Sequence, residues 1–272
     1  MPVKSRTAQL FMSTATVVLL AISGGGCSNI ASRDATGSIS TAASPSSPAT
    51  QDEWRRSLET WGSRYRANPG DADAAIAYAR ALRATDQRAQ AAAVLEQATI
   101  RNPHNMQLLG EYGRALADVG QYKQALDTLG RAHTPDNPDW RILNAQGAVL
   151  DEMGRHAEAQ RHYAAALKIV PDEPSVLSNL GLSYLLTKDL KNAELTLRRA
   201  VAQPNAGPKV RQNLALVVGL LGRFDEAEKI ASADLPEREA AANVAYLREM
   251  LAQKGNWKKI GRAYAPAADA GS

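Results

Sequence analysis

The sequence predicts an all-α protein built as a stack of helical hairpins of constant length. Five segments follow one another at a step of 34 residues, and they start at Ala72, Met106, Trp140, Pro174 and Pro208. The eighth residue of each segment is small, as two closely packed helices require: Ala79, Gly113, Gly147, Gly181 and Ala215. The twentieth residue is alanine in all five, and a proline near position 32 ends four of them. One such hairpin leaves an apolar face uncovered, so the units must stack.

This pattern resembles the tetratricopeptide repeat (TPR), a 34-residue helix–turn–helix unit with small residues at positions 8 and 20 and proline at 32. The resemblance covers residues 72–241 with no insertion between units. It implies a right-handed superhelical TPR solenoid whose first helices line a concave groove, with capping helices at both ends. The implied activity is the binding of a protein partner.

The amino-terminal segment 1–26 is predicted to be an export signal. Lys4 and Arg6 precede an apolar core that is shorter than the roughly 20 residues of a spanning helix. Cys27, the only cysteine, follows small residues and resembles the acylated cysteine of a bacterial lipobox, although Gly24 stands where lipoboxes usually have leucine. The next residue is Ser28 and not Asp, which resembles the signal that sends bacterial lipoproteins to the outer membrane. The alternative is an ordinary signal cleaved near Gly26.

The rest of segment 27–50 is rich in Ser, Thr, Ala and Pro, which predicts a disordered tether between the lipidated Cys27 and the folded body.

Two further segments are predicted to close the ends of the stack. In 51–71, Trp54, Leu58, Trp61 and Tyr65 draw one helical stripe that matches the second helix of a unit without its first, so this segment is an amino-terminal cap. A partner-binding patch is the alternative for its two tryptophans. Segment 242–264 is expected to form carboxyl-terminal capping helices, with Tyr246 a candidate inward residue beside Val244, Leu247 and Leu251, and 265–272 to be a frayed tail.

The groove is where the resemblance places the partner site. Positions 2, 5, 9, 12 and 13 of a TPR unit usually face it, and Asn179 and Lys209 match two positions of the carboxylate clamp of chaperone-binding TPR proteins, whose basic residue is replaced by Asn213. The predicted groove residues are Arg80, Arg83, Arg114, Asn144, Asn179, Leu182, Leu185, Leu186, Lys209, Leu216 and Leu220.

These groove residues are basic and polar at one end of the stack and apolar at the other. The apolar end indicates that the groove binds the apolar face of a partner's helix. The alternative is that the closing helix covers the leucines. We expect Leu185→Glu to weaken partner binding without affecting the fold.

No catalytic, cofactor or metal pattern accompanies the repeats. His156 and His162 are six residues apart and do not share a helix face, and Asp151 and Glu152 point about 100° apart. Phosphate-binding and nucleophile motifs are missing from the sequence. The net charge of +4 falls when the basic signal is removed, and the nearly neutral body that remains gives no reason to expect nucleic-acid binding. We expect no enzyme and no small-molecule substrate; an enzyme with unrecognised groove chemistry is a rival hypothesis.

The whole arrangement resembles the TPR lipoproteins of tight-adherence (Tad, or Flp) pilus assembly, called TadD. The similarity includes an exported cysteine, a tether, five units and the ending 243–260. It implies a lipid-anchored, non-catalytic, pilotin-like scaffold on the periplasmic face of the outer membrane, which binds a secretin or another pilus component. The alternative is an envelope adaptor for outer-membrane protein or cell-wall assembly.

Overall fold

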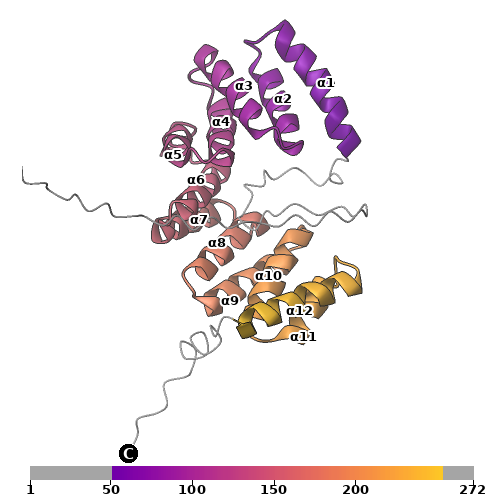
Figure 1. Ribbon diagram of the computed structural model, residues 1–272. Helices are drawn as coiled ribbons and strands as arrows, with labels where there is room; N and C mark the ends of the chain where they lie inside the picture. The colour runs from indigo at the N-terminus through magenta and orange to yellow at the C-terminus, as the bar shows by residue number, and fades with distance from the viewer. Residues whose placement is uncertain (1–50, 254–272) are drawn as a thin grey trace, which may run out of the picture. The chain divides into compact units, whose positions relative to one another are not determined.

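The computed structural model describes residues 51–253, and within them it contains twelve α-helices and no β-strand (Figure 1). The helices are α1 (Gln51–Ala67), α2 (Ala72–Ala84), α3 (Arg88–Arg101), α4 (Met106–Asp118), α5 (Tyr122–Gly130), α6 (Trp140–Glu152), α7 (His156–Ile169), α8 (Pro174–Leu186), α9 (Leu190–Val201), α10 (Pro208–Leu220), α11 (Phe224–Ala231) and α12 (Glu237–Gln253). None of these helices is long and apolar enough to cross a membrane. The predicted signal, Cys27, the tether and the tail lie outside the described residues, as does the capping segment from residue 254.

The even-numbered helices from α2 to α10 begin at the five residues that start the sequence repeats. Side-chain oxygens of Asp71, Asn105, Asp139 and Glu173 accept hydrogen bonds from the first backbone N–H groups of α2, α4, α6 and α8. Such caps supply partners for N–H groups that a helix start leaves unpaired. Proline stands in the first turn of α8 and α10, where its missing N–H costs nothing. Local sequence therefore determines where each first helix begins.

The turn inside each hairpin uses a left-handed backbone at the same repeat position. The φ angles are positive at Gly120, Gly154 and Gly222, and also at Asp86 and Lys188. Glycine adopts this conformation without steric cost, whereas Asp86 and Lys188 adopt a backbone that residues with a side chain rarely use.

The two helices of a hairpin approach closely at the small residues of position 8. A Cβ atom on Gly147 would lie 2.5 Å from Cε1 of Tyr163, and one on Gly113 or Gly181 would lie 2.6 Å from Cγ of Leu129 or Leu197. Glycine at position 8 therefore admits a large side chain from position 24 of the same hairpin. Because these pairs recur along the chain, the core is a series of apolar layers between successive helices.

Helices α1 and α12 pack against the two ends of the repeat array. Leu58 and Tyr65 of α1 pack against the core cluster that contains Ile76 and Leu82 of α2, and the Tyr65 and Tyr78 rings lie 5.9 Å apart. Helix α12 contacts α10 and α11, and its Val244, Leu247 and Leu251 are buried. The inward placement considered for Tyr246 is wrong, because its side chain is 70% exposed.

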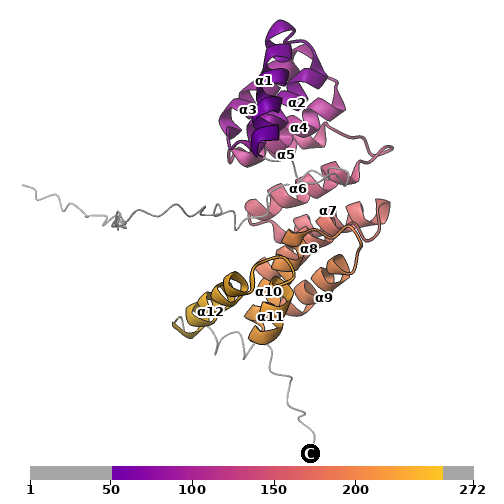
Figure 2. The same cartoon turned by 90° about the vertical axis from the view of Figure 1, so that its right-hand side faces the viewer.

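Helix α5 departs from the regular pattern. It has nine residues, whereas α3 and α7, the second helices of the neighbouring hairpins, have 14 each. A loop over residues 131–139 follows it and carries a short antiparallel bridge between Thr134 and Asn137. Figure 2 shows this loop leading from α5 into α6.

Candidate functional site

The first helices of successive hairpins lie side by side and form a common surface. Helices α2, α4, α6, α8 and α10 contact one another in that order, and α12 contacts α10 in turn. Both views show α8, α10 and α12 in a row beside α9 and α11 (Figures 1 and 2). We call the surface that these helices share, which carries the predicted groove residues, the first-helix face.

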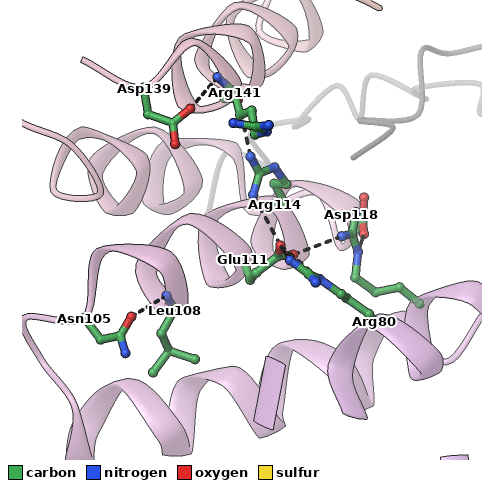
Figure 3. Close-up of polar contacts among 9 residues, drawn as sticks. Arg80, Asn105, Leu108, Glu111, Arg114, Asp118, Asp139 and Arg141 are labelled. Atoms are coloured by element: carbon green, nitrogen blue, oxygen red, sulfur yellow. Dashed lines mark hydrogen bonds and ion pairs between the residues drawn. The ribbon is translucent and has the colours of Figure 1, made fainter. Parts of the chain in front are cut away.

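The α2–α4 end of the first-helix face is held by arginine–carboxylate pairs (Figure 3). Arg80 Nη2 lies 2.7 Å from Glu111 Oε1, and Arg83 Nε lies 2.5 Å from Asp118 Oδ2. Glu111 is buried, and Arg83 Nη1 is 3.7 Å from its second oxygen. Charge-assisted bonds of this kind join two neighbouring first helices. Arg80 and Arg83 thus serve the stack as well as lining its face.

Arg114 is buried, at 6% exposure, and does not line an open surface as predicted. Its Nη1 lies 3.6 Å from Glu111 Oε1, and its Nη2 donates a hydrogen bond to the backbone oxygen of Arg141 at 3.4 Å. Burial lowers the pKa of the Arg114 guanidinium, and the charge of Glu111 opposes that shift. Arg114 therefore links α4 to α6, and this assignment replaces its predicted role in partner contact.

Asparagine side chains link the middle of the face. Asn179 Nδ2 donates to Asn144 Oδ1 at 3.0 Å, and Asn213 Nδ2 donates to Ser178 Oγ at 2.9 Å, one repeat further along. Asn144 is buried, so its predicted partner contact is also corrected to an inter-helix link, whereas Asn179 is half-buried. Lys209 is exposed at the first turn of α10. A carboxylate clamp would require a basic residue at position 213, where this chain has Asn213, whose side chain is bonded to Ser178.

Asp151 is a hydrogen-bond centre between three helices. Its Oδ1 accepts a bond from Ser183 Oγ of α8 at 2.8 Å and lies 2.8 Å from Nδ1 of His156, and its Oδ2 accepts from the Tyr163 hydroxyl at 3.0 Å. Burial and the nearby Asp151 charge raise the pKa of Tyr163 well above its ordinary value, so the phenol stays protonated as a donor. Ser183 is bonded to Asp151 and not to His156, which differs from the nucleophile–base pairing that activates a serine.

An apolar patch occupies the far end of the face. Leu186 is 55% exposed and Leu216 is 40% exposed, and Leu182 and Leu220 are half-buried beside them. Helix α12 adds Tyr246 and the half-buried Met250. Tyr246 stands between the buried Val244 and Leu247, as Leu216 stands between the buried Leu214 and Val217. We define the apolar patch as Leu182, Leu186, Leu216, Leu220, Tyr246 and Met250.

Leu185, which is predicted to face the partner, is half-buried, and its side chain packs against the core cluster that contains Leu214, Val217 and Val244. Leu185→Glu would place a charge against this core, so it is no longer a clean test of binding. Helix α12 reaches α10 through Leu247 and Gly219, where an added Cβ would lie 2.5 Å from Leu247 Cδ2. With Leu186 and Leu216 still exposed, α12 borders the leucines and does not cover them.

Sequence reasoning missed Tyr246 and Met250 as members of this surface. The order of residues in α12 repeats that of α10. Tyr246 follows the buried Val244 as Leu216 follows Leu214, and Met250 follows the buried Leu247 as Leu220 follows Val217. The 34-residue step does not extend into α12, so the inward residues from which this offset is counted are known only from their burial.

The histidines do not gather into a metal site. Among residues 51–253, no group of three or more His, Cys, Asp or Glu side chains could hold a metal ion. The Nδ1 atoms of His133, in the loop before α6, and His162, on α7, are both buried without a hydrogen-bond partner. Burial lowers the pKa of His162, and the nearby His133 adds to this effect.

Comparisons with known proteins agree with this architecture. The family model described as anaphase-promoting complex, cyclosome, subunit 3 matches residues 56–132, and a tetratricopeptide-repeat model matches residues 144–208. No curated protein matches the chain significantly.

Several solved structures share the fold. PilW, described as a widely conserved type IV pilus biogenesis factor, is 16% identical over 71% of this chain and 91% of its own, with a TM-score of 0.61. A thermophilic TPR protein of Thermus thermophilus is 20% identical over 61% of this chain and 91% of its own, with a TM-score of 0.56. The Cut9–Hcn1 hetero-tetramer of the APC/C is 15% identical over 73% of this chain and 40% of that one, with a TM-score of 0.58. Together with the helix order, these matches identify the described part of the chain as an all-α tetratricopeptide-repeat solenoid.

Proposed function

We propose that this protein is a non-catalytic TPR scaffold that holds an apolar segment of a partner protein on its first-helix face. The apolar patch carries this proposal: six neighbouring apolar side chains on α8, α10 and α12 are partly or largely open to solvent. Contiguous exposed apolar surface is costly in a soluble protein and commonly marks an interaction site. The arginine and asparagine links on α2 to α8 keep the surface rigid, which lowers the cost of ordering it on binding.

The partner, in this proposal, is a secretin or another component of Tad/Flp pilus assembly, and the role is pilotin-like. Support comes from the predicted export signal and Cys27, and from the shared fold with PilW, a type IV pilus biogenesis factor. Acylated Cys27 would hold the scaffold on the periplasmic face of the outer membrane, and a tethered site raises the local concentration of its partner there.

The test is affinity capture from solubilised bacterial envelopes, with the full chain carrying a carboxyl-terminal tag as bait. The Leu186→Gln and Leu216→Gln substitutions remove exposed apolar surface and leave the core intact. Leu195→Gln is the matched control, because Leu195 is 67% exposed but lies on the second helix α9. Recovery of a secretin or pilus component that both patch variants lose and Leu195→Gln keeps is the expected result.

Two other outcomes would overturn parts of this proposal. Recovery of outer-membrane protein or cell-wall assembly factors through the same patch would keep the scaffold and replace the pilus role with the envelope-adaptor alternative. If wild type and all three variants recovered the same proteins, the apolar patch would not be the partner site. Palmitate labelling of the full chain, compared with Cys27→Ser, tests the anchor separately.

A further inference from the structure

We infer that the apolar patch receives a single amphipathic α-helix of the partner, which lies along the stack and carries a basic side chain where it passes α6. This inference rests on the proposed function, since it assumes that the patch is the partner site. It adds the secondary structure, the spacing and the charge of the bound segment.

The patch has a regular layout of two rows on three helices. Each helix contributes two residues four positions apart: Leu182 and Leu186 on α8, Leu216 and Leu220 on α10, and Tyr246 and Met250 on α12. Residues four apart on a helix lie on the same face, about 6 Å apart along its axis. One row therefore runs through Leu182, Leu216 and Tyr246, and a second, parallel row runs through Leu186, Leu220 and Met250.

The spacing along each row fits a helical ligand. Packed helices have axes about 8–10 Å apart, which sets the distance between successive apolar side chains in a row. Residues seven apart on an α-helix share a face and lie about 10.5 Å apart, so apolar residues in a heptad pattern meet α8, α10 and α12 in turn. In a β-strand, residues three apart span about 10 Å but point to opposite sides, which prevents a strand from contacting the row in this way.

The second row separates an α-helix from a polyproline II segment. Polyproline II repeats every three residues, about 9.3 Å, and so matches one row but presents only one side chain per turn to a surface. An amphipathic α-helix presents a stripe of two positions per heptad, which can fill the space between two parallel rows. The double row on α8, α10 and α12 therefore selects a helix.

Charge on α6 sets the chemistry at one end of the bound helix. The two rows continue from α8 onto α6 as Ala148 and Glu152. Glu152 is exposed, and the Tyr122 hydroxyl donates to its Oε2 at 3.4 Å, a weak contact that leaves the carboxylate facing solvent. A helix that runs beyond α8 meets this carboxylate, so a lysine or arginine at that end is favoured over an acidic residue.

Synthetic peptides test this inference with the full chain. The probe is a labelled peptide of about three heptads, with leucine at the two apolar positions of each heptad and one lysine-rich end. Two comparison peptides each differ from the probe by one kind of change: a central proline in each heptad, which breaks the helix, or glutamate in place of the terminal lysines. Binding is measured by fluorescence anisotropy at low ionic strength, below the concentration at which the peptides self-associate.

The expected result is that the helical peptide binds and that Leu186→Gln and Leu216→Gln each weaken it about tenfold, whereas Leu195→Gln leaves the affinity unchanged. Tyr246→Gln should weaken binding as well, and Glu152→Lys should reverse the preference between the lysine and glutamate peptides.

If the proline peptide bound more strongly and still depended on Leu186 and Leu216, the bound segment would not be an α-helix, but the proposed function would stand. Equal binding of all peptides to every variant would overturn both, and an unchanged charge preference in Glu152→Lys would overturn the basic contact.

Discussion

Tyr163 donates a hydrogen bond from its hydroxyl to Oδ2 of Asp151 at 3.0 Å, which ties α7 to the first helix of its own hairpin. The same carboxylate accepts the Ser183 hydroxyl of α8 at 2.8 Å, so one side chain joins three helices. Tyr163 and Ser183 are both fully buried, and their hydroxyl groups have no access to water as a substitute partner.

Asp151→Ala should therefore reduce the free energy of unfolding by about 1–3 kcal/mol, because it leaves buried hydroxyl groups without an acceptor. Urea denaturation followed by circular dichroism measures the change. Glu152→Ala is the control on the same helix, since the Glu152 carboxylate is exposed and should cost little. If the two variants were equally stable, Asp151 would not be a structural centre.

The Glu111 network predicts an order of effects. Glu111→Ala should cost about 3–5 kcal/mol, because it leaves the buried Arg114 guanidinium without its carboxylate. Arg80→Ala should cost no more than about 1 kcal/mol, because the Arg80 side chain is 46% exposed and its pairing is screened by water. Thermal and urea unfolding of the two variants would decide this, and the reverse order would contradict the burial of the network.

Gly147→Ala should destabilise the protein by about 1–3 kcal/mol, because the added methyl group collides with the Tyr163 ring. Gly130→Ala is the matched control: no atom lies within 4 Å of its added Cβ, and alanine is the better helix former. Unfolding free energies of both variants are the measurement.

A second-site change tests the cause of that effect. The first repeat accommodates Ala79 and Leu95 together in its buried core, so Gly147→Ala combined with Tyr163→Leu should cost less than the sum of the two single changes. Strict additivity would show that the collision with Tyr163 is not the cause.

The stability of the protein should fall as the pH drops below about 6.5. Burial, aided by His133, holds the pKa of His162 below its ordinary value of 6.5, so the unfolded chain binds a proton that the folded chain resists. The stabilising contribution is complete above pH 6.5 and is lost as the pH falls toward the lowered pKa. Glu158 opposes this shift, and Arg155 and Arg161 reinforce it.

Unfolding free energies of wild type and His162→Gln, measured between about pH 8 and pH 5, test this expectation. The variant should show the smaller loss on acidification, because glutamine does not titrate. His104→Gln, at an exposed loop position, should keep the wild-type profile. An unchanged pH profile in His162→Gln would remove this histidine from the acid sensitivity.

The sequence alone determined the fold and the repeat register. Helix starts, turn positions and the pairing of small with large residues depend on neighbours within one hairpin, and these recur every 34 residues. Any single unit is ambiguous, but five units in phase identify the start of each first helix, and the first-helix face with its apolar end follows from that register.

Only the tertiary structure decided which residues of that face remain open. Arg114 and Asn144 occupy groove positions in the sequence, yet adjacent helices bury them as links, and the half-buried Leu185 packs against the core cluster that contains Leu214. Tyr246 does the opposite and joins the surface, because α12 packs on α10 through Leu247 at Gly219. A repeat position defines a direction from the helix axis, but exposure depends on the lengths and partners of side chains on the next helix, and those are fixed only when the helices pack.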